Sequence, residues 1–144
     1  MMVQLLDELR SILTRVETEL DVHLTGADWA EARVELIHVF VHEACHAALS
    51  SAAPWVHALS DEQHTAVDEV TARLLEDQIA QRLDLYVHAP EQHVRELNAY
   101  PVRITVDQYK HLRDAWRRRY GPSNDLDGIA RYVLAYLYPQ HSNA

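Results

Sequence analysis

Residues that interrupt helices are rare in this chain, and this scarcity is the feature that most constrains its fold. Only three Gly and five Pro occur among 144 residues. Because Gly and Pro end or kink helices, their scarcity predicts long uninterrupted helices. Hydrophobic residues make up 48% of the chain, which is enough to build a core. We therefore predict a mainly α fold, a single compact helical domain over residues 1–144.

Apolar residues at helical spacing, capping residues and prolines divide the chain into six predicted helices. Ser60 or Asp61 is expected to cap the third helix, and Gln63 follows Ser60 at the spacing of a capping box. Asp28 and Asp107 are the predicted caps of the second helix and of the fourth long helix. The helices are predicted at residues 3–22, 29–50, 61–85, 91–98, 107–119 and 125–138, with at most a small β element near residues 102–106.

The net charge of the chain limits the classes of partner that it is expected to bind. A formal net charge of −9 disfavours nucleic acid and anionic membranes. Arg113 and the run 117–119 form a basic spot, for which the favoured interpretation is a solvated helix end. The single cysteine excludes an internal disulfide. No signal peptide and no run of about 18 apolar residues is found, so we predict a cytoplasmic protein.

The residues His42-Glu43-Ala44-Cys45-His46 form an HExxH motif inside the predicted helix 29–50. His42 and His46 are one helical turn apart, so both imidazoles can reach a single ion. Glu43 is rotated by one residue and suits a general base acting on water at the metal. The motif therefore predicts one divalent metal ion, zinc, and Glu43 as the catalytic residue. The alternative is a pair of core histidines that hydrogen-bond to carboxylates or carbonyls.

The other residues of this helix are apolar around nearly its whole circumference, which predicts burial on most sides. Its polar side chains fall in one stripe, and buried polar groups need partners, of which a metal ion is one. We interpret His38 as a hydrogen-bond donor behind the ligands or as a core residue. We interpret Cys45 as a small buried hydrophobe. The stripe consists of Glu31, Glu35, His38, His42 and His46.

A catalytic zinc site needs a third protein ligand, and the next predicted helix carries the candidates. Its apolar positions define a buried face. Asp68 flanks that face, whereas Glu69 points further out, so burial alone favours Asp68. His64 and Glu76 are further alternatives on the same helix.

Together the two helices resemble the gluzincin metallopeptidases, in particular small intracellular zinc peptidases. Their pattern is HExxH followed on a second helix by Glu-x-x-Ala, and here Glu69-Val70-Thr71-Ala72 begins 23 residues after His46. The resemblance lies in the motifs and covers roughly residues 38–80. It implies that His42, His46 and Glu69 hold zinc and that Glu43 is the base. On this ground Glu69 is favoured as the third ligand, while Asp68 stays open.

The leading functional prediction is a zinc-dependent hydrolase, a metallopeptidase with a peptide or protein substrate. The alternative is a helical metal-binding protein without peptidase activity, either an inactive zincin-like module or a di-iron bundle. Glu35-x-x-His38 and Glu43-x-x-His46 both match the ExxH element of di-iron bundles, although those bundles place it on two helices. Four side chains are candidates for stabilising an oxyanion, and for each a structural role is favoured: His93, Tyr100, Arg103 and Tyr109.

Overall fold

The computed structural model describes residues 2–21, 23, 25–100, 102–120 and 125–140. Across these residues the regular structure is helical, so the predicted mainly α fold is confirmed. In the same part of the chain, no helix has the length and apolar character needed to cross a bilayer. The helices are α1 (Met2–Leu20), α2 (Gly26–Ala52), the 3₁₀ helix η1 (Pro54–Ala58), α3 (Asp61–Arg82), α4 (Pro90–Ala99), α5 (Val106–Tyr120) and α6 (Leu126–Leu137).

The contacts of the chain group into two units, Met1–Phe40 and Val41–Ala144. The first unit holds α1 and the N-terminal part of α2. The second holds the rest of α2 and every later helix, and all residues of the candidate site belong to it. The prediction of a single domain stays a prediction.

Two helix starts differ from the prediction because each cap lies earlier in the chain. Thr25 accepts a hydrogen bond from the backbone of Asp28 at 3.2 Å, and Asp28 accepts one from the backbone of Thr25 at 2.9 Å. Thr105 and Gln108 make the same reciprocal pair at 3.1 and 2.9 Å. Both pairs are capping boxes, so the predictions of Asp28 and Asp107 as caps were wrong.

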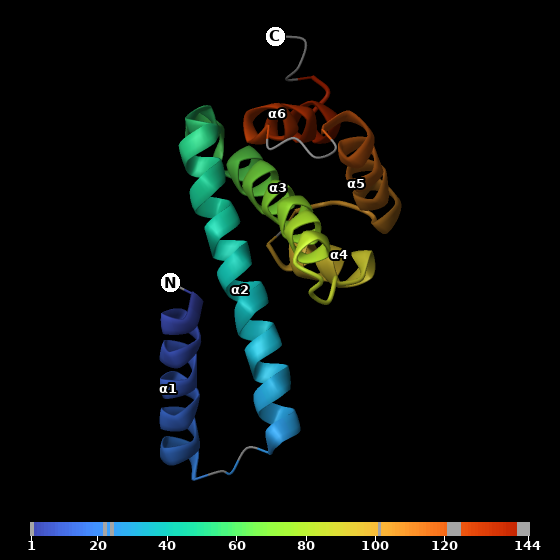
Figure 1. Cartoon of the computed structure of the whole chain (residues 1–144). Helices are drawn as coiled ribbons and strands as arrows, with labels where there is room; N and C mark the ends of the chain where they lie inside the picture. Colours follow the sequence, from blue (N-terminus) through green and yellow to red (C-terminus); the bar gives the residue numbers. More distant parts are fainter. Residues whose placement is uncertain (1, 22, 24, 101, 121–124, 141–144) are drawn as a thin grey trace. The chain divides into compact units, whose positions relative to one another are not determined.

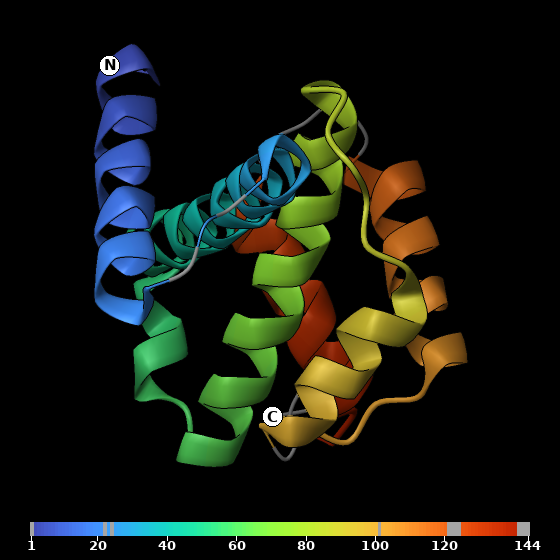
Figure 2. The same ribbon diagram turned by 90° about the horizontal axis from the view of Figure 1, so that it is seen from below.

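Helix α3 is the central element of the second unit: η1, α4 and α6 pack against it, and α5 reaches it through the hydrogen bond of Tyr109 to Asp77 (Figures 1 and 2). Ser60 caps it as predicted, accepting a hydrogen bond from the backbone of Gln63 at 3.3 Å. It ends at Arg82, earlier than predicted, because Asp84 adopts a left-handed φ of 54° that stops the helix. From residue 71 to 77 every side chain is buried, so α3 is enclosed on most sides.

Within the second unit, helix α2 is buried along one face only. Cys45 and Leu49 lie in the core, whereas Ala44, Ala47 and Ala48 are exposed. The prediction that this helix is buried on most sides was therefore wrong at these positions. Alanine counts as apolar, but its single methyl group exposes little surface and costs little in water.

The predicted β element near residues 102–106 is not a strand. Val102 and Ile104 are buried, while Arg103 and Thr105 are exposed, so burial alternates along the segment as it does in a strand. Among the described residues, however, no other strand is present to pair with this segment, and α5 begins at Val106. The segment is an extended connection between α4 and α5, and its side chains Val102 and Ile104 pack in the core.

Candidate metal centre

Three side chains from α2 and α3 converge in the second unit. The Nε2 atoms of His42 and His46 lie 3.0 Å apart. Glu69 lies 3.5 Å from each of them, with Oε2 toward His42 and Oε1 toward His46. Three potential ligand atoms thus lie within 4.8 Å of one another, and the group could hold a metal ion. Among the described residues it is the one group of three or more His, Cys, Asp or Glu side chains with this spacing, and three such side chains are enough to bind one ion.

The spacing of these atoms suits a small ion. Ligand atoms about 2.0–2.1 Å from a tetrahedral zinc ion lie about 3.3 Å from one another. The two Nε2 atoms lie 3.0 Å apart, and each lies 3.5 Å from one oxygen of Glu69, Oε2 for His42 and Oε1 for His46, so the spacing of the two rings and the carboxylate is close to that value. A nitrogen, nitrogen and oxygen donor set is also one that zinc accepts.

The outer nitrogen of each imidazole faces a second carboxylate. Nδ1 of His42 lies 3.1 Å from Oε2 of Glu76, and Nδ1 of His46 lies 3.0 Å from Oδ1 of Asp68. A carboxylate that hydrogen-bonds the outer nitrogen orients a ligating histidine, and Glu76 does so for His42. Asp68, in contrast, lies at ion-pair distance from His46 without hydrogen-bond geometry. Asp68 therefore contacts His46 on the side of the ring away from Glu69.

Glu69 is more enclosed than the helical pattern suggested. Its side chain is 13% exposed, compared with 27% for Asp68, so the expectation that Glu69 points further out was wrong. The physical reason is that α3 is covered on most sides. A side chain that points away from its apolar face is therefore still surrounded by protein. The residue implied by the family resemblance is thus the one that the fold brings to both imidazoles.

Arg73 anchors the carboxylate of Glu69. Its Nη1 donates to Oε2 at 2.6 Å, while the Nη2 group reaches Glu96 at 3.4 Å. Oε1 of Glu69 is left facing His46. Burial acts to raise the pKa of Glu69, but hydrogen bonds from His42, His46 and Arg73 outweigh it and hold that pKa well below its usual range.

The carboxylates also raise the pKa of both histidines. Glu69 and then Glu76 raise the pKa of His42 to about 8. Asp68 and then Glu69 raise the pKa of His46 to about 10. The site therefore favours positive charge strongly, whether that charge comes from protons or from a cation.

A pocket of about 410 Å³ opens beside His46, between the end of α2, η1 and α3. The exposed side chain of Glu43 lies at this pocket. Ser50 and His57 pair there at 2.7 Å, and the ring of His57 meets that of His64 edge to face at 5.0 Å. The lining residues are Glu43, His46, Ala47, Leu49, Ser50, Val56, His57, His64 and Asp68.

Other residues singled out in the sequence lie elsewhere. His93 and Tyr109 are buried, and each makes a hydrogen-bond contact with Asp77. Arg103 and Tyr100 are exposed. The ring of Tyr100 lies 5.7 Å from the guanidinium of Arg73. None of these four lines the pocket beside Glu43. His38 and Cys45 are buried, and burial, helped by the charge of Glu76, raises the pKa of the Cys45 thiol to about 12.

Sequence reasoning missed the roles of Arg73 and Glu76. Glu69, Arg73 and Glu76 follow one another at spacings of four and three residues, which places them on one face of a helix. That spacing was a usable signal that the whole stripe, rather than one carboxylate, faces His42 and His46. Comparison of the chain with protein families, curated proteins and solved structures found no match.

Proposed function

We propose that the protein is a zinc-dependent hydrolase, a small metallopeptidase in which His42, His46 and Glu69 hold zinc and Glu43 is the general base. The observation that carries the proposal is the convergence of two imidazole nitrogens and one carboxylate at 3.0–3.5 Å. The resemblance to gluzincins, which lies in the motifs alone, assigns the same residues to the same roles.

The donor set fits a catalytic rather than a purely structural ion. Three protein ligands leave one position of a tetrahedral zinc ion for water or substrate, whereas structural sites are closed by four. Zinc bound there would polarise the scissile carbonyl of a substrate and lower the pKa of a water molecule. Glu76, hydrogen-bonded to Nδ1 of His42, would keep the Nε2 atom of that ring directed at the ion. The charge of Asp68 lies 3.0 Å from Nδ1 of His46.

Glu43 is suited to proton transfer by its position. It follows a ligand directly in the chain and its exposed carboxylate lines the adjacent pocket. In the proposed reaction it accepts a proton from the attacking water and delivers it to the leaving amine. The pocket would receive a substrate side chain against Leu49 and Val56, with the imidazoles of His57 and His64 available for hydrogen bonds.

Metal content is the first test. Protein purified without added metal and then loaded is expected to hold one zinc ion per chain by atomic emission. Glu69→Ala is expected to lose that zinc on dialysis, whereas Asp68→Ala retains it with weaker affinity. Two irons per chain with a visible absorption band would contradict the zinc assignment. Zinc retained by Glu69→Ala and lost by Asp68→Ala would make Asp68 the third ligand.

Activity is tested with a pool of quenched fluorescent peptides and the zinc-loaded protein. Glu43→Gln is expected to abolish cleavage while zinc content stays at one per chain. Glu35→Gln is the matched control, because Glu35 is an exposed glutamate on the same helix and belongs to the di-iron interpretation. It should change neither zinc content nor cleavage. Cleavage that survives in Glu43→Gln, or a zinc-loaded wild type that leaves the whole pool intact, would overturn the proposed reaction.

A further inference from the structure

A second pocket lies on the other side of α3, between that helix and α5. Its volume is about 330 Å³, within the range of sites for small organic molecules. Leu74, Gln78 and Gln81 face it from α3, about 120–180° around the helix axis from Glu69. It is therefore separate from the candidate metal centre. The lining residues are Leu74, Asp77, Gln78, Gln81, Arg82, Arg113, Trp116 and Arg117.

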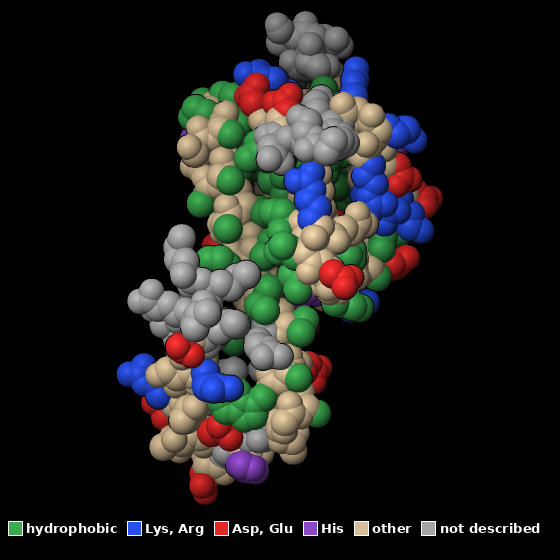
Figure 3. All heavy atoms as spheres, in the orientation of Figure 1, with side chains coloured by type: hydrophobic (Ala, Val, Ile, Leu, Met, Phe, Trp, Pro, Cys, Tyr) green, Lys and Arg blue, Asp and Glu red, His purple; other side chains and the backbone are tan. Residues whose placement is uncertain are grey.

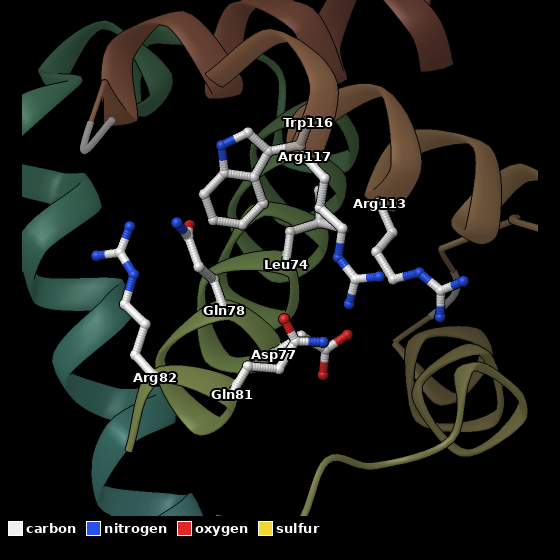
Figure 4. Close-up of a pocket in the computed structure, with 8 residues that line it drawn as sticks. All are labelled: Leu74, Asp77, Gln78, Gln81, Arg82, Arg113, Trp116 and Arg117. Carbon is white, nitrogen blue, oxygen red and sulfur yellow. The ribbon is translucent and has the colours of Figure 1, made fainter. Parts of the chain in front are cut away.

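Positive charge gathers at this pocket although the whole chain carries −9. Arg117 reaches from α5 toward Asp77, Arg113 lies beside it on the same helix, and Arg82 rises from the end of α3 (Figure 4). Lys and Arg side chains also crowd the surface over α5 (Figure 3). Three guanidiniums against one carboxylate leave the lining with a formal charge of +2.

The one lining carboxylate is already engaged. Oδ1 of Asp77 lies 2.8 Å from Nε2 of His93, and Oδ2 accepts a hydrogen bond from Tyr109 at 2.9 Å. Among the described residues no ion pair joins Asp77 to Arg113 or Arg117. Nε of Arg113 makes a 3.4 Å contact with Asp114, which leaves its terminal NH₂ groups for another acceptor. The guanidinium groups of Arg113 and Arg117 therefore have donors that Asp77 does not engage.

The remaining walls add an apolar part and two amides. Trp116 and Leu74 are 4% and 1% exposed, so the pocket has a rigid apolar floor. The amide of Gln78 reaches toward the indole of Trp116 (Figure 4). An aromatic floor with guanidiniums at its edge is complementary to a molecule that has a planar apolar body and an anionic oxygen group.

We propose that the pocket between α3 and α5 binds a small organic oxyanion, a phosphate ester or carboxylate with a planar apolar body. Arg113 and Arg117 hold the anionic group, and Trp116 and Leu74 contact the apolar body. The site does not depend on the metal centre, because the two share no lining residue.

Isothermal titration of the full chain at low ionic strength tests the site, with phenyl phosphate, benzoate, inorganic phosphate and benzyl alcohol as probes. Phenyl phosphate or benzoate is expected to bind one per chain, at least about tenfold more tightly than inorganic phosphate or benzyl alcohol, since both parts of the molecule contribute. Whichever of these two anions binds more tightly identifies the anionic group, phosphate or carboxylate, that the arginines prefer. Equal binding of inorganic phosphate and phenyl phosphate would overturn the role of the apolar floor.

Substitution locates the bound anion. Arg113→Gln combined with Arg117→Gln is expected to weaken binding by about tenfold or more, because charge-assisted hydrogen bonds are lost. Arg118→Gln is the matched control, an exposed arginine on the same helix that does not line the pocket, and it should bind as the wild type does. Binding that persists in the double variant, for example at a metal ion, would overturn the proposal, as would the absence of binding by every probe.

Discussion

Glu76 and Asp77 are neighbours on α3, and each pairs its carboxylate with a histidine. Glu76 lies 3.1 Å from Nδ1 of His42, and Asp77 lies 2.8 Å from Nε2 of His93. The two pairs differ in what surrounds the imidazole. His42 is half-buried and turns its other nitrogen toward His46 and Glu69, whereas His93 is 1% exposed and stacks on Tyr109. A carboxylate–histidine pair alone is therefore no indication of a metal site, whereas the convergence of His42, His46 and Glu69 makes a group that could hold an ion.

The charge around the two pairs differs as well. With neutral histidines, Asp68, Glu69 and Glu76 contribute −3 and Arg73 contributes +1, so the candidate metal centre carries −2. That charge equals what one divalent cation or two protons would neutralise. Asp77 instead has one charge and two hydrogen-bond partners inside the core. The first arrangement is suited to exchange one cation for another, and the second is suited to hold the fold.

The largest effect is expected for Asp77→Ala. It leaves the buried His93 and the hydroxyl of Tyr109 without their acceptor, at about 2 kcal/mol each. We expect the free energy of unfolding to fall by about 4 kcal/mol in urea titrations. Zinc bound per folded chain should not change, because the hydrogen-bond partners of Asp77 are His93 and Tyr109 rather than the candidate metal ligands. Loss of zinc binding by a folded Asp77→Ala protein would contradict the prediction, because it would mean that the Asp77–His93 pair also contributes to metal binding.

Metal binding should depend steeply on pH. Carboxylates raise the pKa of His42 to about 8 and that of His46 to about 10, so the pair holds additional protons at pH 7 in the metal-free protein. The two Nε2 atoms lie 3.0 Å apart and share a proton, which zinc must displace, so at least one proton is released per ion. Affinity should then rise by about 10-fold or more per pH unit below pH 8. Calorimetry in two buffers of different ionisation enthalpy counts the protons, and a count near zero would contradict the prediction.

The metal-free protein should show the opposite dependence. The folded pKa values of both histidines lie above the unfolded value of 6.5. Their contribution to stability is therefore fully present below pH 6.5 and is lost as pH rises through about 8 and then about 10. Thermal melts of the metal-free chain from pH 6 to 10 are expected to show a falling midpoint. A midpoint that rises over this range would mean that the carboxylates do not stabilise the protonated histidines.

A smaller effect is expected for Glu76→Ala. Removing a carboxylate behind a ligating histidine costs about 10–100-fold in metal affinity. His42 is half-buried and can lose its proton, so stability should change much less than in Asp77→Ala. Competition with a fluorescent zinc chelator measures the affinity, and Glu91→Ala, an exposed glutamate on α4, is the control. Unchanged zinc affinity in Glu76→Ala would show that His42 does not depend on Glu76 for its orientation.

Helix positions could be predicted from the sequence, but their surroundings could not. Periodicity and prolines located all six α-helices, since these signals are local. Both wrong caps came from overlooking a threonine, at 25 and at 105, that shares a capping box with a residue three positions on. Residues 102–105 alternate between buried and exposed as a strand would, yet a strand needs a partner strand, which no local pattern reveals.

The candidate site shows the same limit. The HExxH motif predicted which side chains of α2 form one stripe. Whether Asp68 or Glu69 contacts His42 and His46 depends on how α3 packs against its neighbours. Hydrophobic periodicity cannot show this, because it rests on the assumption that the side of a helix opposite its apolar face is exposed to solvent. In the fold, α6, α4 and η1 pack against α3, so that assumption fails and Glu69 is the more enclosed of the two.

The smallest effect is expected for Tyr109→Phe, which removes one hydroxyl from the buried pair on Asp77. Burial, together with the charge of Asp77, raises the pKa of Tyr109 well above its usual value, so the hydroxyl keeps its proton and donates at 2.9 Å. Phe retains the ring stacked on His93 but leaves Oδ2 of Asp77 without that donor, so unfolding should become easier by about 2 kcal/mol. Tyr100→Phe is the matched control, because Tyr100 is 48% exposed and its ring contact with Arg73 survives the change. Urea titrations should place the control within about 0.5 kcal/mol of the wild type. Equal losses in the two variants would mean that the Asp77 pair does not stabilise the core, and the contrast with Glu76 would then rest on the metal ligands alone.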